Sequence, residues 1–136
     1  MEAKLEYKKN QLKNAISDFI LSLKLDLSEL DAPLIDLVKS GQVQKFEFTV
    51  ELLWKVIKVF LDQIHGFDEK SPKSVIKRFF LLEYLSHDEY LLLVDSLNDR
   101  NKLSHIYDKA QFEEIQARLG DYGVLFEKIF TIIETS

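Results

Sequence analysis

The sequence predicts an all-α fold, an antiparallel up-and-down bundle of about four to five helices. Only four Gly and two Pro interrupt its 136 residues, and the β-branched residues are dispersed among Leu, Lys and Glu rather than alternating along strand-length runs. A hydrophobic share of 46% is too high for a disordered chain, and this length suits one buried core. We therefore expect residues 1–136 to form a single helical domain.

The first half of the chain contains three expected helices. Residues 2–23 form the first, because apolar side chains recur there at three- or four-residue steps or sums of them: Leu5, Leu12, Ile16, Phe19 and Leu23. Residues 33–39 form a short second helix that ends at Ser40-Gly41, since glycine commonly follows the end of a helix. Residues 42–65 form a long central helix, closed by Gly66.

Capping residues mark the remaining helices. Ser71 and Pro72 occupy the N-cap and the first helical position of one helix. Ser86 caps the next, whose first turn is acidic and so suits the positive end of the helix dipole. The last helix covers residues 109–134, with a kink or interruption expected at residues 120–123, where two glycines occur.

The central helix carries two separate apolar faces. The broader one is expected to pack inside the bundle and consists of Val43, Phe46, Val50, Leu53, Trp54, Ile57, Phe60, Leu61 and Ile64. The second consists of Phe48, Leu52, Val56 and Val59. It needs a partner of its own, either another helix of this chain or an oligomer contact, because an exposed apolar row of this length is an association site. The polar row between the two faces is interpreted as solvated: Glu47, Glu51, Lys55, Lys58 and Asp62.

Composition indicates the cellular compartment and limits the possible binding partners. The chain has no cysteine, which rules out a disulfide framework or a thiolate zinc site and fits a reducing cytoplasm. The N-terminus is strongly charged, and Lys24 and Asp26 break the most apolar early stretch, so neither a signal peptide nor a membrane span is expected. A net charge of -5 argues against broad electrostatic binding to nucleic acid, so any such contact must be local.

The segment from Arg100 to Tyr107 holds the most chemically informative side chains. Arginine grips a phosphate through a bidentate fork and histidine moves protons near neutral pH, so the pair suggests phosphodiester chemistry without a metal. In the helix that starts at Ser86, polar residues replace the apolar ones at the end of the apolar stripe. These residues are Asn101, Ser104 and His105. Arg100 and His105 stand about 140° apart on an ideal helix. Both side chains can reach one target only in one of three ways. The long arginine side chain bends around the helix, the helix breaks near Ser104, or a two-fold dimer axis brings the two residues together.

Two other charged groups have simpler interpretations. Asp95 and Asp99 are spaced i, i+4, but two carboxylates without further ligands are more typical of a solvated face, so we expect no metal and no cofactor. Basic residues gather around the helix start at Ser71, where they could guide RNA or bind nucleotide phosphates: Lys70, Lys73, Lys77 and Arg78. Ordinary solvated side chains are the preferred interpretation of that group.

By spacing alone, an arginine and a histidine on a helix are typical of a surface ion pair and a core histidine. The motif in this segment and two further stretches, residues 44–55 and 71–76, together favour a functional interpretation. Arg100-Asn101-x-x-x-His105-x-Tyr107 resembles the R-x4-H-x-Y signature of HEPN domains, particularly the small HepT-like proteins also described as nucleotidyltransferase substrate-binding proteins. Residues 44–55 are similar to that family's long-helix signature, and residues 71–76 to its next helix start. These landmarks lie in the expected order over roughly residues 35–110.

The resemblance implies a HEPN-like helical bundle that forms a homodimer and is encoded beside a minimal nucleotidyltransferase as a toxin–antitoxin pair. It implies a metal-independent endoribonuclease that the nucleotidyltransferase neutralises by transferring AMP to the motif tyrosine. Arg100 would then hold the scissile phosphate, His105 would transfer protons, and Tyr107 would accept AMP. Asn101 and Ser104 would support substrate binding.

Two other classes of function stay open. The chain could be a non-catalytic subunit that presents nucleotide or substrate to a separate nucleotidyltransferase, or a dimeric scaffold whose site has decayed. The chain is not itself expected to be a nucleotidyltransferase, because it lacks Gly-Ser followed by an Asp-x-Asp pair that would hold magnesium and the triphosphate.

Overall fold

Five helices make up the fold of the computed structural model, which describes residues 2–105 and 108–136. They are α1 (Glu2–Leu23), α2 (Ala32–His65), α3 (Pro72–Leu81), α4 (His87–Leu103) and α5 (Lys109–Glu134). The prediction of an all-α helical bundle is confirmed. Among the described residues, none of the helices combines the length and the apolar content that a membrane-spanning segment requires.

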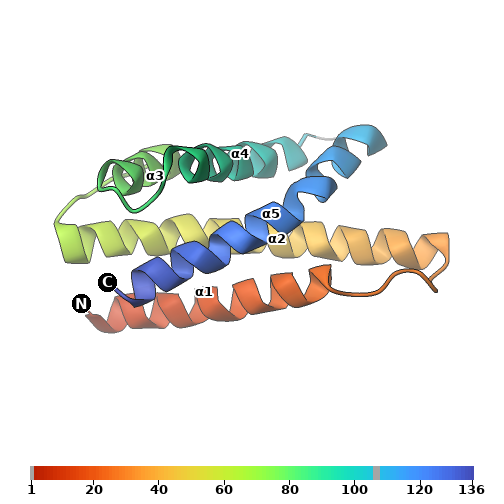
Figure 1. Ribbon diagram of the computed structural model, residues 1–136, viewed down its shortest axis with the longest axis horizontal. Helices are drawn as coiled ribbons and strands as arrows, with labels where there is room; N and C mark the ends of the chain where they lie inside the picture. Colours follow the sequence, from red (N-terminus) through yellow and green to blue (C-terminus); the bar gives the residue numbers. More distant parts are fainter. Residues whose placement is uncertain (1, 106–107) are drawn as a thin grey trace.

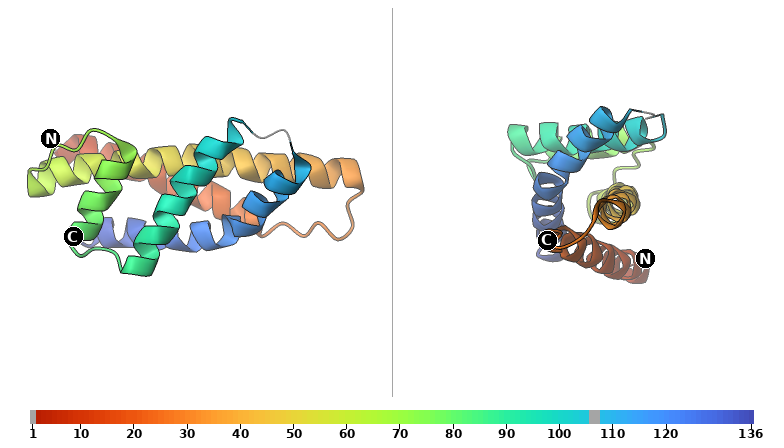
Figure 2. Two further views of the ribbon diagram at one scale, coloured as in Figure 1. Left: turned by 90° about the horizontal axis from the view of Figure 1, so that it is seen from above. Right: turned by 90° about the vertical axis from the view of Figure 1, so that its right-hand side faces the viewer.

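The long helices α1, α2 and α5 lie side by side, with α1 antiparallel to the other two (Figure 1). The shorter helices α3 and α4 form a hairpin that crosses α2 steeply, as the view from above shows (Figure 2). Both chain ends lie at the same end of the molecule (Figure 1). This arrangement leaves the C-terminus of α4 next to the start of α5, where the motif segment lies.

One apolar core joins all five helices. At its centre, Phe46 of α2 packs against Phe19 of α1 and against Tyr122 and Phe126 of α5, and all four side chains are fully buried. The face of α2 predicted to be buried is largely so, although Trp54 is half-buried and Ile64 is exposed. Burial of this aromatic cluster is the main reason that the amphipathic helices associate.

Local capping explains where most helices begin and end. Asp31 caps α2 through a hydrogen bond from the Leu34 amide, and Gly66 closes the helix in a left-handed conformation with φ 74°. Ser71 and Ser86 each form a capping box at the starts of α3 and α4. The helix starts predicted at Ser71 and Ser86 and the stop at Gly66 are therefore confirmed.

The prediction that Ser40-Gly41 ends a helix is wrong, since α2 is continuous from Ala32 to His65. A mid-helix glycine costs about 1 kcal/mol relative to alanine. That cost is small beside the burial of Val43 and Phe46 in the following turn. The interruption predicted near residues 120–123 is also absent from α5, where a Cβ on Gly123 would lie 3.4 Å from an Ile20 side-chain carbon of α1. Glycine there permits close helix packing.

The second apolar face of α2 is divided between core and surface. Val56 and Val59 are buried inside the bundle, whereas Leu52 is half-buried and Phe48 is 61% exposed. The intramolecular explanation therefore holds for the C-terminal half of this face.

Replacing Gly41 by alanine is expected to raise the free energy of unfolding by about 1 kcal/mol, because glycine is a poor helix former and nothing lies within 4 Å of the added Cβ. Gly66→Ala should lower it by about 1 kcal/mol, because alanine resists the positive φ of Gly66. Urea unfolding of both variants checks this contrast, and a loss of stability in Gly41→Ala would contradict it.

Candidate functional site

Helix α4 positions the motif residues. Its start is fixed by the Ser86 capping box, in which the Glu89 carboxylate accepts a hydrogen bond from the Ser86 amide at 2.8 Å. A hydrogen bond from Lys128 and the bond from the Ser86 backbone hold the pKa of Glu89 below its usual range. Buried Leu93 and Leu97 then anchor the helix on the core.

The helix ends at Leu103, so the helix break near Ser104, one of the three alternatives for bringing Arg100 and His105 to a common target, is present. The Ser104 amide donates to the Asn101 carbonyl at 3.3 Å, and the His105 amide donates to the Lys102 carbonyl at 2.8 Å. His105 therefore extends from the turn that follows α4, while Arg100 extends from the helix itself. Both Ser104 and His105 are exposed.

Arg100 faces α2. Its Nε lies 3.3 Å from Oε2 of Glu51, close enough for an ion pair, yet this N–H is buried and is not aligned to donate a hydrogen bond. Glu51 also pairs with Lys55 at 3.4 Å. A surface pocket of about 300 Å³ adjoins the pair and is lined by Glu51, Ser71, Pro72, Lys73, Leu97, Arg100 and Asn101. The predicted solvated row on α2 is thus partly engaged in contacts with α4.

His105 faces a different pocket, between the end of α4 and the first half of α5. This pocket has a volume of about 440 Å³ and is lined by Asn101, Lys102, His105, Gln111, Glu114, Ile115 and Arg118. Asn101 lines both pockets. The structure therefore brings Arg100 and His105 into adjoining pockets within one chain, but not into the same pocket.

Two predicted site residues lie apart from this geometry. Ser104 lines neither pocket, although it caps the helix between them. Tyr107, the predicted acceptor of AMP, lies outside the described residues.

A charged cluster beside the His105 pocket was not predicted. Asp99 is only 3% exposed, and its carboxylate accepts two hydrogen bonds from Arg118, from Nε and Nη2, each at 2.8 Å. The hydroxyl of buried Tyr122 also donates to Asp99. The interpretation of Asp99 as part of a solvated face is therefore wrong. Arg118 and Tyr122 stand one turn apart on α5, but spacing within one helix does not reveal a partner on another.

Burial first, and then the hydrogen bond to Asp99, raise the pKa of Tyr122, so its hydroxyl stays protonated and donates. The hydrogen bonds to Asp99 likewise raise the pKa of Arg118, which keeps its charge at any ordinary pH. The three side chains form a fixed link between α4 and α5.

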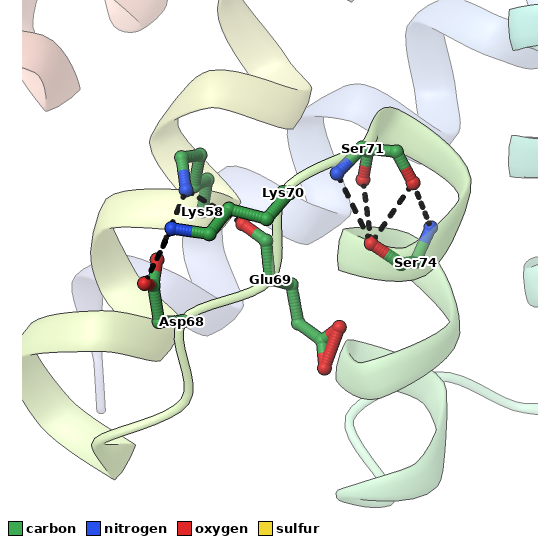
Figure 3. Close-up of polar contacts among 6 residues, drawn as sticks. All are labelled: Lys58, Asp68, Glu69, Lys70, Ser71 and Ser74. Atoms are coloured by element: carbon green, nitrogen blue, oxygen red, sulfur yellow. Dashed lines mark hydrogen bonds and ion pairs between the residues drawn. The ribbon is translucent and has the colours of Figure 1, made fainter.

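The connection between α2 and α3 ends at Ser71, which lines the Arg100 pocket. Figure 3 shows the polar contacts of this connection. Lys58 donates to the Glu69 carbonyl at 2.6 Å and pairs with Asp68, which also accepts from Lys70 at 2.7 Å. Ser71 and Ser74 exchange the hydrogen bonds of the capping box (Figure 3). These contacts hold the connection that leads into α3 against α2.

The basic group around Ser71 is mostly solvated, as the preferred interpretation has it, since Lys70, Lys73 and Lys77 are exposed and Arg78 is half-buried. Lys70 pairs with Asp68, and Arg78 pairs with Glu69 while its guanidinium lies 4.3 Å from the centroid of the Phe67 ring. Lys73 lines the Arg100 pocket. Among residues 2–105 and 108–136, no three His, Asp or Glu side chains cluster closely enough to hold a metal ion.

Comparison with known proteins identifies a matching protein family and a similar solved structure. The family model described as nucleotidyltransferase substrate binding protein like matches residues 7–134. A protein of Thermus thermophilus, known from its crystal structure, has the same fold with a TM-score of 0.80 and 26% sequence identity. The similarity covers 90% of this chain and 98% of that one. No curated protein matches significantly.

Proposed function

Because the chain belongs to the nucleotidyltransferase substrate-binding protein-like family, we propose that it works with a separately encoded minimal nucleotidyltransferase, as the HEPN component of a toxin–antitoxin module. The observation that supports this role is the arrangement of Arg100, Asn101 and His105 in adjoining surface pockets at the end of α4. The proposed activity is endoribonuclease cleavage.

The reaction needs three groups. A base removes the proton of the RNA 2′-hydroxyl, whose oxygen attacks the adjacent phosphorus. An acid gives a proton to the departing 5′-oxygen, and a guanidinium stabilises the negative charge of the phosphorane between these events. The products are a 2′,3′-cyclic phosphate and a free 5′-hydroxyl. This chemistry requires one proton acceptor and one proton donor.

One chain supplies one motif histidine, and its motif arginine lies in the neighbouring pocket. A two-fold homodimer supplies two of each, and can place Arg100 of one copy beside His105 of the other. RNA bound in such a composite site would offer Arg100 a phosphate in place of Glu51. The separation seen within one chain supports a composite site in a dimer.

The first test is cleavage by the purified protein alone, at a concentration where light scattering shows the dimer. With a chelator present, RNA should be cut to fragments that end in 2′,3′-cyclic phosphate and begin with 5′-hydroxyl. A confirmed dimer that leaves a mixed RNA pool intact contradicts the ribonuclease proposal.

Mixing the protein with the nucleotidyltransferase and ATP tests regulation. AMP is expected on Tyr107, detected by peptide mass spectrometry, and cleavage should fall in parallel because a charged group is added two residues from His105. Tyr107→Phe is the control, since it removes the acceptor hydroxyl and keeps the ring.

A second candidate function is a binding subunit without nuclease activity. The ion pair between Arg100 and Glu51 favours it, because a paired guanidinium is less available to a phosphate. The same mixture discriminates the two: AMP on a third molecule, with no RNA cleavage, supports substrate presentation to the nucleotidyltransferase.

A further inference from the structure

The pocket beside His105 contains a guanidinium that does not belong to the motif. Arg118 extends into it from α5, together with Asn101 and Lys102 from α4. The motif arginine, Arg100, lines the neighbouring pocket and faces Glu51. Within one chain, Arg118 is thus the arginine that shares a pocket with the motif histidine.

Hydrogen bonds to Asp99 fix the position of the Arg118 side chain. A guanidinium carries five N–H donors in a planar fork. Nε and Nη2 each give one to the buried carboxylate of Asp99, and Tyr122 anchors the same carboxylate. The Nη1 edge is left out of these bonds, and the side chain is 40% exposed. A guanidinium held in this way loses little conformational freedom when it binds a ligand.

Charge and hydrogen-bonding groups around this edge indicate the ligand. Lys102 adds a second positive charge to the lining, Glu114 a negative one, and the amides of Asn101 and Gln111 can pair with sugar or base. Because Asp99 offsets the charge of Arg118, the pocket suits one singly charged phosphodiester better than a polyphosphate.

We propose that Arg118 binds a backbone phosphate of single-stranded RNA in the same pocket as His105, as a substrate-positioning residue. This inference rests on the proposed ribonuclease function, and it adds a second phosphate contact on α5 to the one expected from Arg100. Arg118 would hold the phosphate next to the scissile one and align the chain with the His105 imidazole.

A purely structural role for Arg118, as the partner of Asp99, is the alternative. The test is binding of a fluorescent 2′-O-methyl oligonucleotide, which lacks the nucleophilic hydroxyl and is not consumed. Arg118→Gln should weaken binding roughly tenfold, as expected for one charge-assisted hydrogen bond, and should reduce the slope of log affinity against log salt by about 0.7.

The matched control is Arg78→Gln. Arg78 is also a partly exposed arginine paired with one carboxylate, Glu69, but it lies outside the pocket. The Arg78→Gln variant should bind the oligonucleotide with an affinity within about twofold of that of the wild type. The slope of log affinity against log salt should be unchanged. Because Arg118→Gln leaves a buried carboxylate without its cation, Asp99→Asn/Arg118→Gln serves as a second variant, and circular dichroism checks that both are folded.

A measurement on the wild type needs no variant. The Nε–H of Arg118, protected by Asp99, should give a slowly exchanging NMR resonance that shifts when the oligonucleotide is added. The proposal is overturned if this resonance does not move, if both Arg118 variants bind like Arg78→Gln, or if the wild type binds no oligonucleotide. Binding through Arg118 without cleavage of unmodified RNA would instead refute the ribonuclease function and keep this pocket as an RNA site.

Discussion

Replacement of His105 by alanine is expected to lower the rate of RNA cleavage by about 10²–10⁴-fold, the usual contribution of one general acid or base. His105 is exposed and lies beyond the last turn of α4, so its removal takes no side chain from the core. The free energy of unfolding should therefore change by less than about 0.5 kcal/mol. Initial cleavage rates and urea unfolding measure the two effects separately.

The matched control is His87→Ala. His87 is another exposed histidine, but it lies in the first turn of α4, at the end of the helix opposite to His105. Its removal should leave cleavage within about twofold of the wild-type rate, since surface substitutions away from the site have small effects. Equal loss of cleavage in both variants, or none in either, would argue against His105 as the proton carrier.

Phe46→Ala is expected to lower the free energy of unfolding by about 3–5 kcal/mol. The Phe46 ring is fully buried, with its centroid 5.3 Å from that of Tyr122 and 6.2 Å from that of Phe19. Its truncation leaves a cavity where α1, α2 and α5 meet, and the surrounding rings cannot fill it without leaving their own contacts. Equilibrium urea unfolding, followed by circular dichroism, measures the loss.

Phe48→Ala is the internal comparison, because Phe48 lies two residues further along α2 and is 61% exposed. At protein concentrations low enough to keep the chain monomeric, its stability should stay within about 0.5 kcal/mol of the wild type. A similar loss in both variants would mean that Phe48 is covered in the folded protein in solution.

Most of the correct predictions from the sequence, such as helix ends and buried residues, rest on signals within a few residues of one another. Ser71 and Ser86 precede their helices with the side chains needed for a capping box, and Gly66 supplies the left-handed residue that ends α2. Each signal acts within a few residues, so it can be recognised without knowledge of the partner helices. The spacing of apolar residues likewise predicted that Phe46 would be buried.

Gly41 shows the limit of that reasoning. The same residue type ends a helix at Gly66 and continues one at Gly41. The difference comes from packing, because the residues after Gly41 reach the core while the chain must turn after Gly66 towards α3. A preference of about 1 kcal/mol is readily outweighed by tertiary contacts.

The candidate site was predictable in part. Helical geometry correctly indicated that Arg100 and His105 diverge, and the helix does end near Ser104. The partners that hold the two pockets in place, Glu51 and Arg118, come from other helices. Their contacts depend on how α2 and α5 pack on α4, which no spacing within α4 encodes. The role of Tyr107 stays a prediction.

The bond between Asp99 and Arg118 also limits how α4 and α5 can move. It fastens α4 to α5 on either side of the connection that starts after Leu103 and ends at Lys109. Pulling the two helices apart would leave the buried Asp99 carboxylate without its cation, which costs about 3–5 kcal/mol. The two helices are therefore expected to move together, as one unit, rather than to separate at this end.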